Sequence, residues 1–143
     1  MKNQIPPSNP KALNLGLEIV AMRKKFPGFQ LTKGRKTFWI GTLQPSKKSD
    51  LYQVKVVYNP YIPKVFILDP HIIPFAPHRY PDLSLCLYHP MDNSFGGESL
   101  ISDTIIPWTS EWLFFYEAWL EEGVWWGKEA PHSPTGKTDD EVR

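Results

Sequence analysis

The sequence predicts an α+β protein in which one antiparallel sheet is flanked along the chain by two helices. Three observations support this class: a stretch with helical spacing comes first, four short strand-like runs follow, and a second helical stretch comes after them. Strands joined by short connections pair as an antiparallel meander, because a parallel crossover needs a dozen or more residues. With 143 residues, 41% of them apolar, we expect a single domain over 1–143, with a core at about 10–132 and a polar tail at 133–143.

The first helix is predicted over 10–26. Asn9 is suited to the N-cap position and Pro10 to the first helical position. Basic residues at 23–25 favour the last turn, and Pro27-Gly28 ends the helix. Its predicted apolar stripe consists of Leu13, Leu17, Val20 and Ala21.

Four strands are predicted over 29–32, 37–43, 51–58 and 64–68, with turns at 33–35 and 59–63. The third strand alternates most clearly, because successive side chains of a strand point to opposite faces. Its apolar face consists of Tyr52, Val54, Val56 and Tyr58.

A long loop is predicted after the last strand. Seven prolines lie between Pro60 and Pro90, so the segment 69–91 cannot form a regular element and is expected to be stiff. Long structured loops in compact domains usually carry function. The second helix is predicted to begin at Pro107 and to end before Gly123, with a covered face of Trp108, Trp112, Phe115, Tyr116, Trp119 and Leu120. We expect the tryptophans at 108, 112, 119, 125 and 126 to pack in the core.

Composition indicates a cytoplasmic protein. A single cysteine cannot form an internal disulfide, and no apolar run reaches membrane-spanning length. The charges are unevenly distributed: the segment up to Ser49 has ten Lys/Arg and one acidic residue, whereas the segment from Asp50 onward has six Lys/Arg and fourteen acidic residues. The N-terminal part is therefore either a basic docking surface or a set of solvated faces. We expect no nucleic-acid partner, metal or cofactor, because neither a nucleic-acid motif, paired metal ligands nor a nucleotide-binding loop is recognisable.

The predicted order of elements and several motifs resemble a ubiquitin-conjugating (E2) domain. Residues 61–68 are similar to the E2 run Tyr-Pro…Pro-x-Val-x-Phe, and Leu85-Cys86-Leu87 resembles the Ile-Cys-Leu around the E2 nucleophile. His78-Arg79-Tyr80 stands where E2 enzymes carry His-Pro-Asn, so Tyr80 replaces the asparagine implicated in stabilising the oxyanion. The resemblance implies a UBC-like fold with a long active-site loop.

The chain more closely resembles the bacterial E2-like proteins of CBASS antiphage operons, in particular the stand-alone type that lacks an E1 partner. The resemblance spans about residues 10–132 and rests on the motifs at 78–80, 85–88, 106–108, 111–113 and 125–129. It implies action on the C-terminus of a cGAS-like cyclic-oligonucleotide synthase. The expected function is an E2-like cysteine acyltransferase, in which Cys86 forms a thioester with this partner and transfers it to a lysine amine, priming antiphage signalling.

Cys86 is the expected nucleophile, with its sulfur exposed on the loop, because a thiol is nucleophilic near neutral pH and leaves readily. The alternative is a buried structural cysteine. Tyr80 or nearby backbone amides would stabilise the oxyanion. His78 and His89 are candidates to tune the thiol or to move protons; the alternative is that His78 holds the loop through hydrogen bonds and that His89 is simply exposed. Asp82 and Asp92 either accept a proton from the incoming lysine or cap the loop.

Two other function classes remain open from the sequence. A non-catalytic E2-like scaffold would bind the synthase without using Cys86, and a thiol hydrolase would cleave a substrate instead of joining two.

Overall fold

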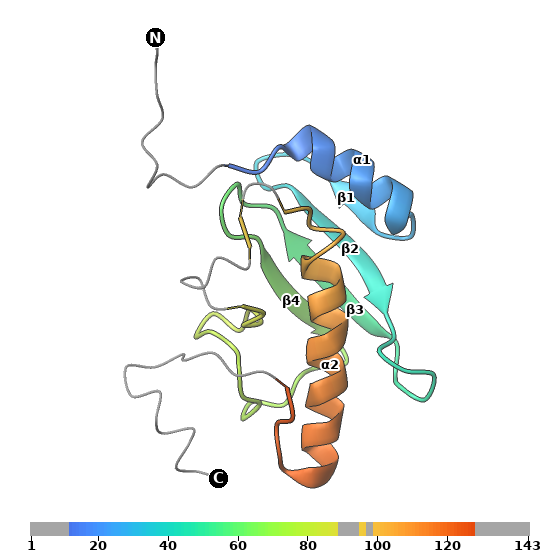
Figure 1. The fold of residues 1–143 in the computed structure, drawn as a ribbon, viewed down its shortest axis with the longest axis vertical. Helices are drawn as coiled ribbons and strands as arrows, with labels where there is room; N and C mark the ends of the chain where they lie inside the picture. The colour runs from blue at the N-terminus through green and yellow to red at the C-terminus, as the bar shows by residue number, and fades with distance from the viewer. Residues whose placement is uncertain (1–11, 89–94, 97–98, 128–143) are drawn as a thin grey trace.

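The computed structural model describes residues 12–88, 95–96 and 99–127, which fold into two helices and a four-stranded sheet (Figure 1). This arrangement confirms the predicted α+β class and the order of its elements. The elements are α1 (Leu15–Lys25), β1 (Gln30–Thr32), β2 (Phe38–Leu43), β3 (Tyr52–Val57), β4 (Lys64–Asp69) and α2 (Ile105–Glu122).

The sheet is an antiparallel meander with the order β1-β2-β3-β4, as predicted. Its register forms a row across all four strands, in which Leu31 is opposite Trp39, Trp39 opposite Val56, and Val56 opposite Val65. The last three side chains are at most 2% exposed, so this row is part of the core face. The predicted alternation of β3 is confirmed, because Tyr52, Val54 and Val56 are buried.

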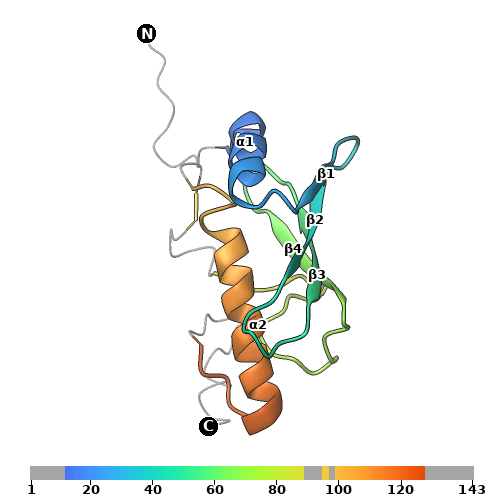
Figure 2. The ribbon, with the colours of Figure 1, turned by 90° about the vertical axis from the view of Figure 1, so that its right-hand side faces the viewer.

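Helix α2 lies along the core face of the sheet (Figure 2). It begins two residues before the predicted Pro107, which therefore occupies the first turn, where a missing N–H costs no intrahelical bond. The helix buries six side chains: Ile105, Ile106, Thr109, Trp112, Leu113 and Tyr116. The prediction that Leu120 is covered was wrong, since its side chain is 49% exposed on the last turn, which extends past the strands (Figure 1).

Helix α1 begins at Leu15, five residues later than predicted, and the proposed cap at Asn9 and Pro10 lies outside the described residues. Asn14 caps the helix instead, and its side chain accepts a hydrogen bond of 3.1 Å from the Leu17 amide. The predicted apolar stripe was also wrong, because Leu17 and Val20 are each 60% exposed. The helix buries Glu18 and Met22.

Between β4 and α2, the described part of the predicted loop contains no helix or strand, only one isolated bridge between Arg79 and Leu85. The loop packs against α2 and the segment after it, where Trp125 contacts both His78 and Trp112. Trp126 is 63% exposed, so its assignment to the core was wrong. Neither helix in the described part of the chain combines the length and the apolarity that crossing a bilayer requires.

Candidate active site

The cysteine-bearing segment folds back on itself as a short hairpin. The Cys86 amide donates to the His78 carbonyl (2.9 Å), and the Tyr80 amide donates to the Ser84 carbonyl (2.9 Å). This register makes Tyr80 and Cys86 diagonal neighbours, a separation that an aromatic side chain spans. The hairpin therefore brings the predicted nucleophile and the predicted oxyanion residue together.

A three-residue turn, Pro81-Asp82-Leu83, closes the hairpin. The Leu83 amide donates to the Tyr80 carbonyl (2.8 Å), and Leu83 itself has a left-handed backbone conformation with φ of 75°. A turn followed by a left-handed residue is a common way to close a three-residue hairpin loop, but that position usually holds glycine. Leucine at this position strains the backbone.

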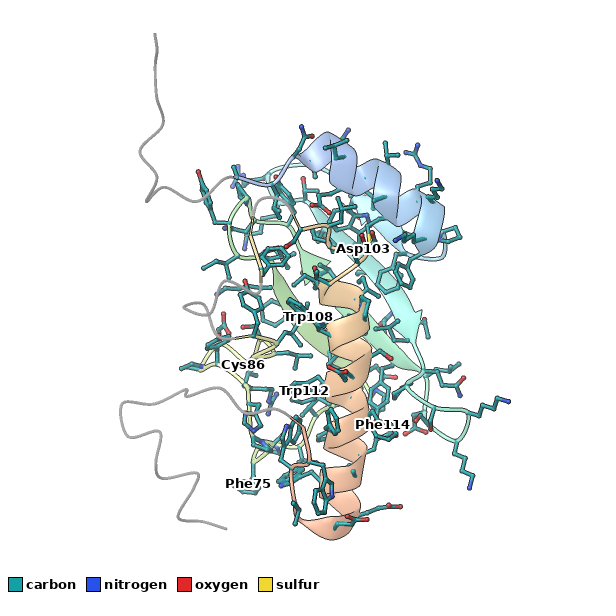
Figure 3. The ribbon with its side chains drawn as sticks, in the orientation of Figure 1. Phe75, Cys86, Asp103, Trp108, Trp112 and Phe114 are labelled. Carbon is teal, nitrogen blue, oxygen red and sulfur yellow. The ribbon has the colours of Figure 1, made fainter. Side chains whose placement is uncertain are left out.

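The sulfur of Cys86 lies between two tyrosines. Its thiol donates to the Tyr80 hydroxyl oxygen at 3.5 Å and lies 3.9 Å from the Tyr88 carbonyl oxygen. The residue is only 8% exposed, so the expectation of an exposed sulfur was wrong. The cause is a contact with the sheet: the Leu85 amide donates to the Val65 carbonyl of β4 (2.9 Å) and draws the segment against the protein body (Figure 3).

Two opposing effects act on the acidity of this thiol. Burial raises the pKa of Cys86 above its ordinary value, and the hydrogen bond between the thiol and the Tyr80 hydroxyl opposes that rise. The pKa of Tyr80 is also raised, first by burial and then by its contact with Cys86. At neutral pH the pair is therefore a thiol beside a protonated phenol, which can donate to sulfur once the thiol loses its proton.

Helix α2 holds the loop on which this hairpin is built. The Trp112 indole nitrogen donates to the His78 carbonyl (3.1 Å), and the Tyr116 hydroxyl accepts from the Ile73 amide (3.1 Å). His78 is 9% exposed, has a left-handed φ of 62°, and its ring lies 4.7 Å from the Trp125 ring. The sequence indicated Trp112 and Tyr116 only as core residues, because an indole–carbonyl bond across 34 residues leaves no local pattern.

Asp82 lies in the turn and is fully engaged there. One carboxylate oxygen pairs with the Lys64 ammonium at 2.5 Å, and the other accepts from the amide (2.9 Å) and the hydroxyl (2.6 Å) of Ser84. These contacts, led by the one with Lys64, lower the pKa of Asp82 to about 2. Sequence analysis identified neither Lys64 nor Ser84, although a serine two residues after an aspartate is a recognisable turn signal.

A small pocket of about 30 Å³ adjoins the tyrosine that contacts the sulfur. Its walls are mainly apolar and include Ile62, Pro63, Tyr80, Leu85, Leu87 and Tyr88. His89 and Asp92, which the sequence indicated as further candidates, lie outside the described residues. Within the described ranges, no three potential metal ligands come together.

A helix, a four-stranded meander, a cysteine-bearing loop and a covering helix define the ubiquitin-conjugating-enzyme-like (E2-like) class of fold. A family model described as "Type II CBASS E2 protein" matches residues 18–133, which include the whole candidate site. The chain belongs to this family of antiphage defence proteins, as the sequence motifs indicated. No curated protein matches the sequence.

Proposed function

We propose that this protein is an E2-like cysteine acyltransferase of a stand-alone E2 system. Cys86 would take the C-terminal carboxyl of a cGAS-like nucleotidyltransferase as a thioester and pass it to a lysine amine, which primes antiphage signalling. The proposal rests on the 3.5 Å contact between the Cys86 thiol and the Tyr80 hydroxyl, inside the region that matches a family of E2-type proteins.

In the first step the Cys86 thiolate attacks the carbonyl carbon of an activated acyl group. A carbon–sulfur bond forms, and the activating group leaves with the electron pair of its former bond to that carbon. The donor has to arrive as an acyl adenylate or a thioester, because a free carboxylate is a poor electrophile. The thiol proton passes to solvent before or during this attack.

Tyr80 is the group best placed to stabilise the oxyanion of this step. The amides of Leu85 and Cys86 already donate to the carbonyls of Val65 and His78. The Tyr80 hydroxyl instead lies beside the sulfur, where the attacked carbonyl has to arrive. Loss of a single oxyanion donor typically lowers the rate by about 10²-fold to 10³-fold, so in Tyr80→Phe we expect the rate of acylation, corrected for the ionised fraction of Cys86, to fall by about this factor.

In the second step an unprotonated lysine amine attacks the thioester, an amide bond forms, and the Cys86 thiolate leaves and takes up a proton. Asp82 is unsuited to accept the proton of this amine, because its carboxylate is occupied by Lys64 and Ser84. We propose a structural role for Asp82, while the proton of the amine goes to solvent.

The test is incubation of the purified protein with the neighbouring synthase and an activating system, followed by non-reducing gels. We expect an adduct that hydroxylamine cleaves in the native protein, none in Cys86→Ala, and a more persistent oxyester in Cys86→Ser. Intact mass distinguishes conjugation from hydrolysis, because only conjugation adds the mass of the donor. Absence of any cysteine-dependent adduct would reject the acyltransferase.

A non-catalytic scaffold is the second candidate, and the low exposure of Cys86, at 8%, favours it. A scaffold would bind the synthase with unchanged affinity in Cys86→Ala, and cells that carry this variant would still resist phage. The acyltransferase requires that the same variant loses phage resistance while it retains binding.

A further inference from the structure

We propose that Lys64, Asp82 and Ser84 form a clamp that positions the Tyr80 hydroxyl on the Cys86 sulfur, and so controls how readily the thiol ionises. Lys64 is the first residue of β4, whereas the other two lie in the hairpin turn. The inference deepens the proposed function, since it assumes that Cys86 is the reacting group, and it assigns positioning residues to the site.

The first argument is connectivity. Asp82 joins the sheet to the turn through Lys64 and fixes the turn through the amide and the hydroxyl of Ser84. Ser84 is also the backbone partner of Tyr80, because its carbonyl accepts the Tyr80 amide at 2.9 Å. The clamp therefore acts on Tyr80 through one covalently continuous turn.

The second argument is strain. Leu83 lies between the two clamp residues of the turn with φ of 75°, a conformation that costs a non-glycine residue roughly 1–2 kcal/mol. Leu83 is also 57% exposed, so the burial of its side chain offsets little of this strain. A strained turn keeps its geometry only where neighbouring contacts over-determine it, and the contacts of Asp82 do so here together with the bond from the Leu83 amide to the Tyr80 carbonyl.

The third argument is the distance that has to be maintained. The oxygen–sulfur separation of 3.5 Å is well inside the limit for hydrogen bonds to sulfur, but a small opening of the turn would break the contact. Without this contact, the thiol would lose the hydrogen bond that opposes the effect of burial on its acidity. Among the described groups, Tyr88 and Asp82 act electrostatically on Tyr80, and Lys64 pairs with Asp82.

A positioning role and a direct electrostatic effect of Asp82 predict opposite shifts in the pKa of Cys86 for the substitution Asp82→Asn. Asp82→Asn removes a negative charge, and the loss of its Coulomb repulsion alone would favour the thiolate and lower the pKa of Cys86. If Asp82 acts through Tyr80, the same change loosens the turn, weakens the hydrogen bond to sulfur and raises that pKa. The direction of the shift therefore separates the two explanations.

The experiment measures the rate of iodoacetamide alkylation against pH, which is specific because Cys86 is the only cysteine. The midpoint of the profile reports ionisation of the thiol, and its plateau reports access to the sulfur. We expect Tyr80→Phe to raise the midpoint by about one pH unit, a tenfold lower rate at pH 7. We expect Asp82→Asn, Ser84→Ala and Lys64→Met each to raise it by part of that shift, and Lys64→Arg to retain the native midpoint.

The double variant Tyr80→Phe/Asp82→Asn provides the decisive control. Its midpoint should equal that of Tyr80→Phe alone, because a clamp that acts through Tyr80 has nothing left to position. Additive shifts, an unchanged midpoint in Tyr80→Phe, or a lowered midpoint in Asp82→Asn would each overturn the proposal. If Asp82→Asn fails to fold, Ser84→Ala decides the outcome, since it removes a single hydroxyl.

This assay needs no acyl donor, so its outcome is separate from that of the proposed function. If the variants show the expected midpoints but the protein forms no adduct with the synthase, the proposed clamp stands and the proposed acyltransferase is rejected. If the protein forms the adduct but all clamp variants have the native midpoint, the proposed acyltransferase stands and the proposed clamp is rejected.

Discussion

The surroundings of Cys86 favour an acylated sulfur over a free thiolate. Burial penalises the charged thiolate and raises the pKa of Cys86, whereas a thioester is neutral and escapes that penalty. A residue that is 8% exposed also leaves little room for water to attack the thioester. The same burial that slows ionisation of the thiol would therefore protect the intermediate once it has formed.

Leu83 offers a residue-scale prediction about strain in the turn. In Leu83→Gly the left-handed conformation no longer costs roughly 1–2 kcal/mol, which raises the free energy of unfolding. The greater conformational entropy of the unfolded glycine variant lowers that free energy by about 0.5–1 kcal/mol. We expect the free energy of unfolding to rise by up to about 1.5 kcal/mol. Urea denaturation followed by tryptophan fluorescence measures this change.

The matched control for this prediction is Leu17→Gly, because Leu17 is 60% exposed, close to the 57% of Leu83, but lies in helix α1. There glycine relieves no strain and lowers the free energy of unfolding by about 1 kcal/mol. The two leucine-to-glycine substitutions should thus change the free energy of unfolding in opposite directions. If Leu83→Gly destabilised the protein as much as Leu17→Gly, the turn would not be strained.

At the scale of elements, helix α2 is both a cover for the sheet and a support for the cysteine-bearing loop. Its buried face packs on the sheet, and two of the same residues, Trp112 and Tyr116, bond to the loop backbone at His78 and Ile73. Since the Cys86 amide also donates to the His78 carbonyl, the helix and the hairpin meet at one oxygen atom. The position of Cys86 therefore depends on α2.

Trp112→Phe tests this dependence. The variant keeps an aromatic ring in the core but removes the donor to the His78 carbonyl, which should cost about 0.5–1.5 kcal/mol beyond the loss of packing. We expect faster amide hydrogen exchange over residues 72–88, measured by mass spectrometry on peptide fragments.

Trp39→Phe is the control for Trp112→Phe. Trp39 is equally buried, at 2% exposure against 4%, and its indole makes no hydrogen bond within the described residues. This variant should lower the free energy of unfolding while exchange over the loop changes no more than it does elsewhere. Equal exchange over the loop in both variants would show that the indole bond does not hold it.

For the whole molecule, the elements that follow from local pattern were predicted, and those that depend on distant contacts were not. The meander follows from the alternation of β3 and from short connections, both visible in sequence. The buried side of α1 is determined by Glu18, whose partner Ile101 is 83 residues away. No periodicity rule places a glutamate in the core.

The candidate site divides in the same way. Cys86 and Tyr80 were identifiable from a short motif, because the hairpin that joins them is local. The burial of the sulfur was not, because it depends on the Leu85 amide reaching the Val65 carbonyl of β4. The contact between Lys64 and Asp82 leaves no local sequence pattern for the same reason, since the two residues are 18 positions apart.

The buried Glu18 makes the stability of the whole fold depend on pH. It is 1% exposed and accepts the Ile101 amide at 2.8 Å, which joins α1 to the segment before α2. Burial, with a smaller contribution from the charge of Asp103, raises the pKa of Glu18 above its ordinary value. A raised pKa in the folded state means that its stabilising contribution is complete below about pH 4 and is lost as the pH rises through the folded value.

Glu18→Gln should remove this dependence, because an amide oxygen still accepts the Ile101 amide and carries no charge at any pH. We expect the free energy of unfolding of the variant, relative to the native protein, to rise as the pH increases from about 4 and to level off once the pH exceeds the folded pKa of Glu18, measured in guanidinium titrations between pH 4 and pH 8. Glu111→Gln, at an exposed position of α2, controls for loss of a carboxylate and should show no such trend. A constant difference between the Glu18→Gln variant and the native protein across this range would mean that Glu18 ionises in the folded protein as easily as in the unfolded chain, and that its burial carries no electrostatic cost.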